Sequence, residues 1–255
     1  MNDTSVRILG HRGGAAGRYP ENSIPAFLDG RAAGADVLEL DVRLSRDGRV
    51  VVIHDDRIDR VSDGSGAVHS LGAAELRRVR LLDPNGVPHD GVHIPVLEEV
   101  MEACGDTPLN IDLKSADHEL ARAVAEILRR YDAVARTTVA SFIPAALQFF
   151  RSIAPEVETS AAPDEVRALL GAFLRRERPT TPAHRVQIPP RHGLIPLTWR
   201  GFIRYLHAVD LAVDVWTINA PEVAVRLAAR GVDGIVTDDV RTIRTALEKH
   251  HHADT

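Results

Sequence analysis

A closed (β/α)8 barrel, the TIM-barrel fold, is the class that this sequence predicts. Short apolar runs alternate with amphipathic stretches of about 10 to 15 residues, which indicates parallel strands joined by helical crossovers. The alternation gives eight strand–helix units in 255 residues, an ordinary size for an undivided barrel. Polar residues follow many strands rather than one switch point, which disfavours the alternative of a doubly wound open sheet.

The elements are predicted in chain order. The first strand covers 6–10, and its helix begins at Asn22 or Ser23, both good N-caps, and ends at Gly34. The second strand is the first arm of a hairpin whose apolar arms cover 37–44 and 50–53. Later strands are expected at 109–113, 137–141, 157–161, 185–188, 213–218 and 234–237, with helices at 118–131, 144–153, 163–177, 198–209, 221–230 and 240–249.

The hairpin brings chemistry together within a short stretch. An Asp-Gly pair between apolar arms is a strong hairpin signal, and here it is Asp47-Gly48. A turn centred on that pair would set His54 across from Asp41. Side chains alternate along a strand, so Glu39 and Asp41 share one face. The fold-back therefore predicts two carboxylates beside an imidazole.

Residues 57–95 interrupt the rhythm. The segment is rich in Asp, Gly and Ser, with one short helical patch at 73–79, and a helix at 96–103 returns the chain to the barrel. Long connections in compact domains often carry function. The whole chain, 1–255, is interpreted as one barrel domain in which the insertion 57–95 caps the rim of the site.

Composition excludes several classes of protein. The formal net charge of −5, without basic runs interleaved with aromatic residues, argues against nucleic-acid binding. No apolar run approaches ~20 residues, so no membrane span or stable membrane insertion is expected. No secretory signal is visible and Cys104 is the single cysteine, which favours the cytoplasm. The sequence does not determine the oligomeric state.

Polar residues gather at the strand ends, where barrels place their active sites. By strand, these are His11 and Arg12 from the first; Glu39 and Asp41 from the second, with His54 on the return arm; Asp112 and Lys114 from the third; Trp216 and Asn219 from the seventh; and Asp238 from the eighth. Individually, each has an ordinary structural explanation, such as a core tryptophan or a Lys–Asp pair. Their coincidence on one rim favours a site.

These residue types predict phosphoryl chemistry. The carboxylates of Glu39, Asp41 and Asp112, with no thiolate nearby, favour one Mg2+ or Ca2+ ion over zinc. Arg12 and Lys114 add fixed positive charge that suits an anion beside the ion. Two histidines that titrate near neutrality can act as general acid and general base.

The sequence also resembles the glycerophosphodiester phosphodiesterase family. The matching segments run in order from about residue 8 to residue 239, most weakly over about 142–200. They are His11-Arg12-Gly13, Pro20-Glu21-Asn22-Ser23, Gly34-Ala35-Asp36, Glu39-Leu40-Asp41-Val42, Asp47-Gly48, His54-Asp55, Ile94-Pro95-Val96-Leu97-Glu98-Glu99, Ile111-Asp112-Leu113-Lys114, Val215-Trp216-Thr217-Ile218-Asn219 and Gly234-Ile235-Val236-Thr237-Asp238.

The resemblance implies a (β/α)8 barrel that uses a divalent cation to hydrolyse glycerophosphodiesters to an alcohol and sn-glycerol 3-phosphate. It implies that 57–95 is the family's small insertion. By position, the family's roles fall on these residues: His11 and His54 as the catalytic pair, Glu39 and Asp41 as metal ligands, and Arg12 as the phosphate contact.

Two positions depart from the family pattern. Asp112 stands where the family usually has Glu, so its shorter side chain changes the reach to the ion, and the ion's affinity or identity with it. Ile143 stands where relatives often have a polar residue, which puts a minor substrate contact in question. The resemblance does not reveal the alcohol head group or the physiological metal.

The mechanistic hypothesis has the neighbouring glycerol hydroxyl attack phosphorus, with His11 as base and His54 as acid, and water then opening the cyclic phosphate. Direct attack by water needs the same residues. Two rival functions remain. A phospholipase of C or D type would need an exposed apolar rim, and the sequence displays no convincing one. A non-catalytic phosphodiester-binding barrel would have no need for two titrating imidazoles.

Overall fold

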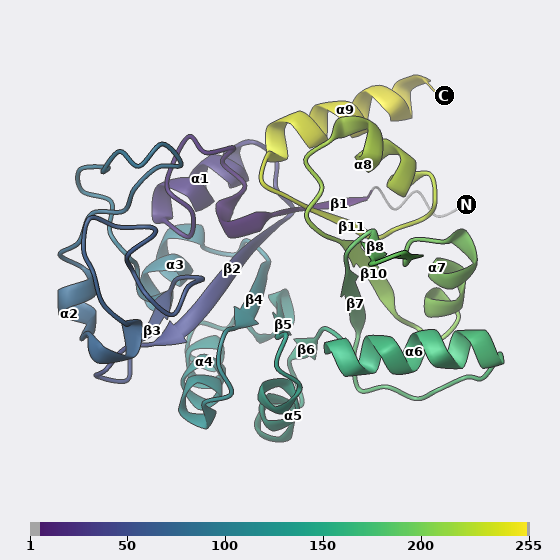
Figure 1. Ribbon diagram of the computed structural model, residues 1–255, viewed down its shortest axis with the longest axis horizontal. Coiled ribbons are helices and arrows are strands. Elements are labelled where there is room, and N and C mark those ends of the chain that lie inside the picture. The colour runs from purple at the N-terminus through teal and green to yellow at the C-terminus, as the bar shows by residue number, and fades with distance from the viewer. Residues whose placement is uncertain (1–5, 254–255) are drawn as a thin grey trace.

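Eight parallel strands form a barrel in the computed structural model, which describes residues 6–253 (Figure 1). Their spatial order is β6-β5-β4-β2-β1-β11-β10-β7. Their bounds are β1 Arg7–Gly10, β2 Val37–Leu44, β4 Leu109–Leu113, β5 Thr137–Ala140, β6 Glu158–Thr159, β7 Arg185–Ile188, β10 Ala212–Val215 and β11 Gly234–Thr237. The predicted barrel is confirmed, and the open doubly wound sheet is wrong.

The barrel closes between β6 and β7, its weakest seam. The two strands meet through one bridge, between Ser160 and Arg185. Backbone hydrogen bonds from Ala161 N to Arg185 O at 2.8 Å and from His184 N to Thr159 O at 2.9 Å hold this seam. The first and last strands of the chain, β1 and β11, pair in parallel over four positions. The N- and C-terminal parts of the chain therefore meet inside the barrel wall.

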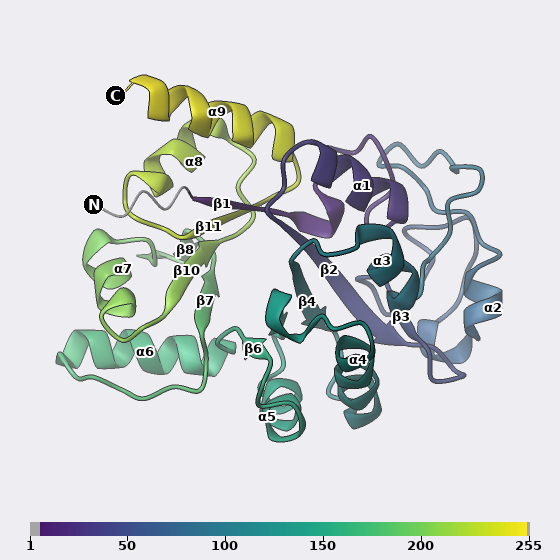
Figure 2. The same cartoon turned by 180° about the vertical axis from the view of Figure 1, so that it is seen from behind.

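One helix follows each strand unit and covers the outside of the barrel, as Figures 1 and 2 show from opposite sides. The bounds are α1 Ile24–Ala32, α3 Leu97–Cys104, α4 His118–Arg130, α5 Pro144–Ile153, α6 Pro163–Arg175, α7 Arg200–His207, α8 Pro221–Ala228 and α9 Val240–Ala253. The side chains of Leu38, Leu40 and Val42 point outward into the apolar layer beneath α1 and α3–α5. Alternation along β2 then turns Glu39 and Asp41 inward.

The hairpin forms, but its predicted register is wrong by one residue. The antiparallel return strand β3 (Val50–Val52) pairs Val42 with Val52, and Ile53 N donates to Asp41 O at 2.9 Å. Ile53 rather than His54 therefore lies across from Asp41. The reason is a three-residue loop between Ser45 and Arg49, with Gly48 at φ 75°. Gly supplies the left-handed conformation that such a loop needs.

The insertion 57–95 has an apolar core of its own. Ile58, Val68 and Leu76 are buried against Val51 and Ile53 at the return arm of the hairpin. The segment contains a short helix, α2 (Ala73–Leu76), within the helical patch predicted there. Packing on β3 holds the insertion beside the second strand, where Figure 1 places it on the left of the molecule.

Between β7 and α7 the chain forms a small hairpin that the sequence did not predict. Its strands are β8 (Arg191–His192) and β9 (Ile195–Pro196), and they pair with each other in a separate two-stranded sheet. With two residues in each strand, no alternation pattern could reveal it. Two residues of the hairpin, His192 and Ile195, line the cavity at the barrel mouth.

Within residues 6–253, no helix is both long enough and apolar enough to cross a membrane.

Candidate active site at the barrel mouth

A sharp turn after β1 presents the first two predicted site residues, His11 and Arg12. Arg12 adopts a left-handed conformation, with φ 49°, and Gly13 follows at φ 105°. A Cβ atom on Gly13 would lie 2.7 Å from Ala26 Cβ, so no larger residue fits against α1. The turn aims Arg12 N at Glu39, where it donates to Oε2 at 2.9 Å. The His-Arg-Gly motif is thus a backbone requirement as well as a chemical one.

Asp41 is the most heavily paired carboxylate of the site. It is 1% exposed and forms ion pairs with Lys114 Nζ at 2.9 Å and Arg12 Nε at 3.2 Å. Asn22 Nδ2 also donates to Asp41 Oδ2 at 2.8 Å. Burial alone would raise the Asp41 pKa, but the Lys114 and Arg12 charges outweigh it and hold this pKa below its usual value. Asp41 is therefore ionised.

Glu39 and Asp112 have too few positively charged neighbours to offset their burial, and the pKa of each carboxyl is raised. Burial and the Asp41 charge raise the pKa of Glu39 to about 7. Burial also raises the pKa of Asp112, although Lys114 Nζ lies 2.6 Å from its Oδ2 and opposes the shift. Asp112 Oδ1 is buried without a hydrogen-bond partner. Strands β2 and β4 pair Asp41 with Asp112 in register, which explains why these carboxylates crowd together.

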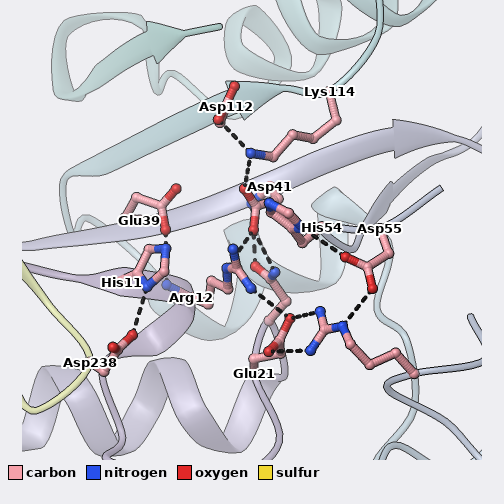
Figure 3. A network of polar contacts seen from close by, with 12 residues as sticks. His11, Arg12, Glu21, Glu39, Asp41, His54, Asp55, Asp112, Lys114 and Asp238 are labelled. Carbon is pink, nitrogen blue, oxygen red and sulfur yellow. Dashed lines mark hydrogen bonds and ion pairs between the residues drawn. The ribbon is translucent and has the colours of Figure 1, made fainter. Parts of the chain in front are cut away.

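His54 follows β3 and is fixed by its neighbour in sequence. His54 Nδ1 lies 2.7 Å from Asp55 Oδ1, and Asp55 Oδ2 accepts from Arg60 Nε at 2.6 Å. The Arg60 hydrogen bond is the main reason that the Asp55 pKa falls to about 2. Arg60 also binds Glu21, which accepts from Arg12 Nη1 at 3.0 Å. A continuous polar network therefore runs from His54 through Asp55, Arg60 and Glu21 to Arg12 and Asp41 (Figure 3).

His11 is held from the opposite end of the chain. Its Nδ1 lies 2.6 Å from Asp238 Oδ1, and Asn219 Nδ2 donates to Asp238 Oδ2 at 2.6 Å. Burial lowers the pKa of His11, but the Asp238 hydrogen bond and the Glu39 charge outweigh it, so that the net shift is upward. Each histidine thus has its own carboxylate at Nδ1, and Nε2 is left for another partner.

Eight of the ten residues that the sequence places at the strand ends line one cavity of about 490 Å3 at the barrel mouth. They are His11, Arg12, Glu39, Asp41, His54, Asp112, Lys114 and Trp216. The other two, Asn219 and Asp238, do not line the cavity, and Asp238 contacts His11 Nδ1 while Asn219 donates to Asp238.

The sequence between residues 11 and 242 matches the family model of the glycerophosphoryl diester phosphodiesterases. The chain belongs to this family. A glycerophosphodiester phosphodiesterase from Bacillus altitudinis is 31% identical over 239 residues, covering 91% of this chain and 94% of that protein. One from Caldanaerobacter subterraneus is 29% identical over 254 residues, covering 95% and 98%. The crystal structure of a glycerophosphodiester phosphodiesterase from Agrobacterium tumefaciens superimposes with a TM-score of 0.76 at 28% identity, covering 93% and 99%.

Both the resemblance and the enzyme class predicted from the sequence are confirmed: the chain is similar along its length to phosphodiesterases of glycerophosphodiesters. The rival of a non-catalytic barrel is therefore disfavoured. The ion, the catalytic roles and the location in the cell remain predictions.

The carboxylates of this phosphodiesterase fit a divalent cation in donor type and in charge. Glu39, Asp41 and Asp112 offer hard oxygen ligands. Two of them have raised pKa values, and one oxygen of Asp112 has no partner. Among residues 6–250, whose side chains are described, no three His, Cys, Asp or Glu side chains are arranged so that they could hold a metal ion. The ammonium of Lys114 lies between Asp41 and Asp112 instead.

Several polar residues of this phosphodiesterase site were missed as functional candidates. Asn22 belongs to a segment that matches the family, and the only role predicted for it is that of a possible N-cap. In the structure Ser23 caps α1 and Asn22 donates to Asp41. Glu21 and Asp55 belong to the segments Pro20-Glu21-Asn22-Ser23 and His54-Asp55, which match the family. Their place in these segments, close to site residues, is the signal that could have identified them. Arg60 gave none, because only the packing of the insertion carries its guanidinium to Glu21 and Asp55.

Proposed function

We propose that this phosphodiesterase hydrolyses glycerophosphodiesters to an alcohol and sn-glycerol 3-phosphate in a metal-dependent reaction, with His11 and His54 transferring the protons. The observation that carries the proposal is the matched pair of imidazoles in one cavity. Each has Nδ1 within 2.7 Å of a carboxylate, Asp238 for His11 and Asp55 for His54. A carboxylate that accepts a hydrogen bond from the Nδ1–H group leaves Nε2 free to take or give a proton.

The first step of the proposed reaction moves two protons, one to His11 and one from His54. His11 Nε2 takes the proton of the glycerol hydroxyl as its oxygen bonds to phosphorus, and His54 gives a proton to the alcohol oxygen as its bond to phosphorus breaks. Water then opens the cyclic phosphate with the roles reversed, which restores both histidines. If water attacks directly, His11 takes the proton of water and His54 protonates the alcohol, no cyclic phosphate forms, and the two histidines return to their starting states by exchanging a proton with solvent. The Asp238 hydrogen bond and the Glu39 charge shift the pKa of His11 upward, which makes its imidazole a stronger base.

The remaining residues bind charge. Arg12 and Lys114 lie at the cavity wall and favour an anionic phosphodiester next to the histidines. Glu39, Asp41 and Asp112 would hold the divalent cation, Mg2+ or Ca2+, which when bound supplies positive charge against the phosphoryl oxygens. Trp216 offers an aromatic wall to the substrate.

The direct test is release of glycerol 3-phosphate from glycerophosphocholine, measured after chelation and again with Mg2+, Ca2+ or Mn2+ restored. We expect activity to fall to background with chelator and to return with at least one ion. Circular dichroism in chelator provides the control that the protein remains folded. Full activity in chelator would contradict metal dependence, and no release from folded protein with any ion would contradict the proposed substrate.

Asp238→Asn tests how His11 is positioned. We expect kcat to fall by about 10- to 100-fold, because the amide cannot stabilise the protonated imidazole and removes part of the acid–base contribution. The Asp238 hydrogen bond raises the pKa of His11. Losing it lowers that pKa, so the acidic limb of the pH profile of kcat/KM should move to lower pH if His11 is the base.

Asp233→Asn is the matched control for this change. Asp233 also pairs with a histidine, His207 Nε2 at 2.8 Å, but neither residue lines the cavity. We expect the control to leave the pH profile in place. An unshifted limb in Asp238→Asn would contradict the assignment of His11 as base.

A further inference from the structure

Arg43 lies beside the active site without lining its cavity. It is on β2, two residues beyond Asp41, so the alternation along the strand turns both side chains to the same face. The Arg43 side chain is partly buried and lines a neighbouring surface pocket of about 440 Å3. His54 lines both this pocket and the cavity at the barrel mouth, whereas Arg43 lines the pocket alone. Any effect of Arg43 on the reaction must therefore pass through another residue.

The guanidinium of Arg43 donates two hydrogen bonds, and both go to main-chain oxygens. Nε donates to His54 O at 2.9 Å, and Nη1 donates to Lys114 O at 3.3 Å. The negative charges of Asp56 and Asp41 also act on the guanidinium, but no carboxylate among the described side chains forms an ion pair with it. The planar group thus spans the main chain of two site residues.

These two oxygens belong to segments on opposite edges of β2. Val42 pairs with Val52 of β3 on one edge and with Leu113 of β4 on the other. His54 follows β3 and Lys114 follows β4, and neither residue belongs to a strand. The side chain of Arg43 therefore joins the two segments to each other and to β2 at the point where their strands have ended.

Other contacts of His54 and Lys114 leave their separation unset. The Asp55 contact orients the imidazole of His54 relative to its own main chain, because the two residues are consecutive. Lys114 reaches the carboxylates of Asp41 and Asp112 through a long, flexible stem. The Arg43 contact instead fixes the main chain of both residues relative to β2.

We propose that Arg43 is a positioning residue, which holds the main chain of His54 and of Lys114 at a fixed separation so that the imidazole meets a phosphodiester bound at Lys114. The proposal rests on the proposed function for the roles of His54 and Lys114. A displacement of ~1 Å in an active site lowers the rate by up to about 100-fold, so loss of the Arg43 contacts should be visible in kcat.

Arg43→Ala and Arg57→Ala form a matched pair, because both remove one positive charge from the same pocket. Arg57 pairs with Asp59 at 3.1 Å and has no described contact with His54 or Lys114. We expect Arg43→Ala to lower kcat for glycerophosphocholine by about 10- to 100-fold and Arg57→Ala to change it by less than about twofold. Equal losses in the two variants would overturn the proposal, because they would show that charge alone matters.

A p-nitrophenyl ester of glycerol phosphate distinguishes a displaced His54 from a general defect of the fold. Since p-nitrophenolate departs without being protonated, a displaced general acid costs this ester less. We expect the loss of kcat in Arg43→Ala to be at least about threefold smaller for the p-nitrophenyl ester than for the choline ester. Equal losses for both esters would contradict the positioning of His54.

Arg43→Lys provides a second variant, which keeps the positive charge. Its ammonium is a single donor atom, whereas Nε and Nη1 are two atoms of one rigid plane. We expect kcat for glycerophosphocholine to be at least about fivefold below that of the unaltered protein, with thermal unfolding by circular dichroism unchanged. A kcat equal to that of the unaltered protein would overturn the need for two donor atoms.

Hydrogen–deuterium exchange separates this proposal from the proposed function, because it requires no turnover. We expect the amides of 53–56 and 113–116 to exchange at least about fivefold faster in Arg43→Ala, and those of 113–116 to be unchanged in Arg57→Ala. Faster exchange with undiminished turnover of glycerophosphocholine would support the Arg43 contacts and contradict the proposed role of His54. Unchanged exchange with unchanged kcat would overturn the positioning role and leave the proposed function in place.

Discussion

Replacing His54 by alanine is expected to lower kcat for glycerophosphocholine by about 100- to 10,000-fold, the usual contribution of a positioned acid or base. His54 lines the cavity, and its Nδ1 is fixed by Asp55, whose carboxylate is in turn held by Arg60. This network prepares one nitrogen to give a proton and would be lost with the imidazole. The measurement is steady-state release of glycerol 3-phosphate, with thermal unfolding followed by circular dichroism.

The nature of the departing alcohol separates the roles of the two histidines. If His54 is the acid, His54→Ala should impair a p-nitrophenyl ester far less than the choline ester, because p-nitrophenolate departs without being protonated. His11→Ala should impair both esters alike, because the base acts on the attacking oxygen. His207→Ala is the control, since this surface histidine does not line the cavity. Unchanged turnover in His54→Ala would rule out its catalytic role.

Arg185→Met is expected to reduce the free energy of unfolding by about 3 to 5 kcal/mol, the usual cost of leaving one member of a buried ion pair alone. Arg185 Nη1 lies 2.9 and 2.7 Å from the two oxygens of Asp214, which is 0% exposed inside the barrel. Gln187 donates to the same carboxylate at 3.2 Å, and Arg7 lies 3.7 Å away. Neither of these contacts fully replaces the guanidinium.

Urea denaturation measures this loss. Arg175→Met is the matched control, because its partner Glu177 is 54% exposed and solvent-exposed ion pairs contribute little to stability. A loss below about 1 kcal/mol for Arg185→Met would contradict this prediction and would indicate that Arg7 replaces the guanidinium as the partner of Asp214. Neither Arg185 nor Asp214 lines the active-site cavity, so the folded variant should retain turnover of glycerophosphocholine.

Much of the candidate site could be predicted because its residues lie beside strong local patterns. Glu39 and Asp41 sit on a buried strand whose alternation fixes their direction. His11 follows the apolar strand β1, and Asp112 lies near the end of the apolar strand β4. The carboxyl ends of these strands meet at one rim of a parallel barrel. Arg60 could not be found in this way. Its place depends on how the insertion packs onto β3, and that packing involves side chains far apart in the sequence.

The sequence by itself determined the eight-unit barrel, the hairpin and the family, because hydrophobic periodicity, turn residues and short motifs are properties of neighbouring residues. Only the tertiary structure decided the register of the hairpin, in which Ile53 and not His54 lies across from Asp41. It also decided where the barrel closes, between β6 and β7, and the presence of the β8–β9 hairpin. The exposed apolar rim, which the sequence does not display, was decided there too: Phe142 and Ile195 line the cavity and are 59% and 46% exposed. They come from separate elements, and each is an ordinary apolar residue until barrel closure brings them together.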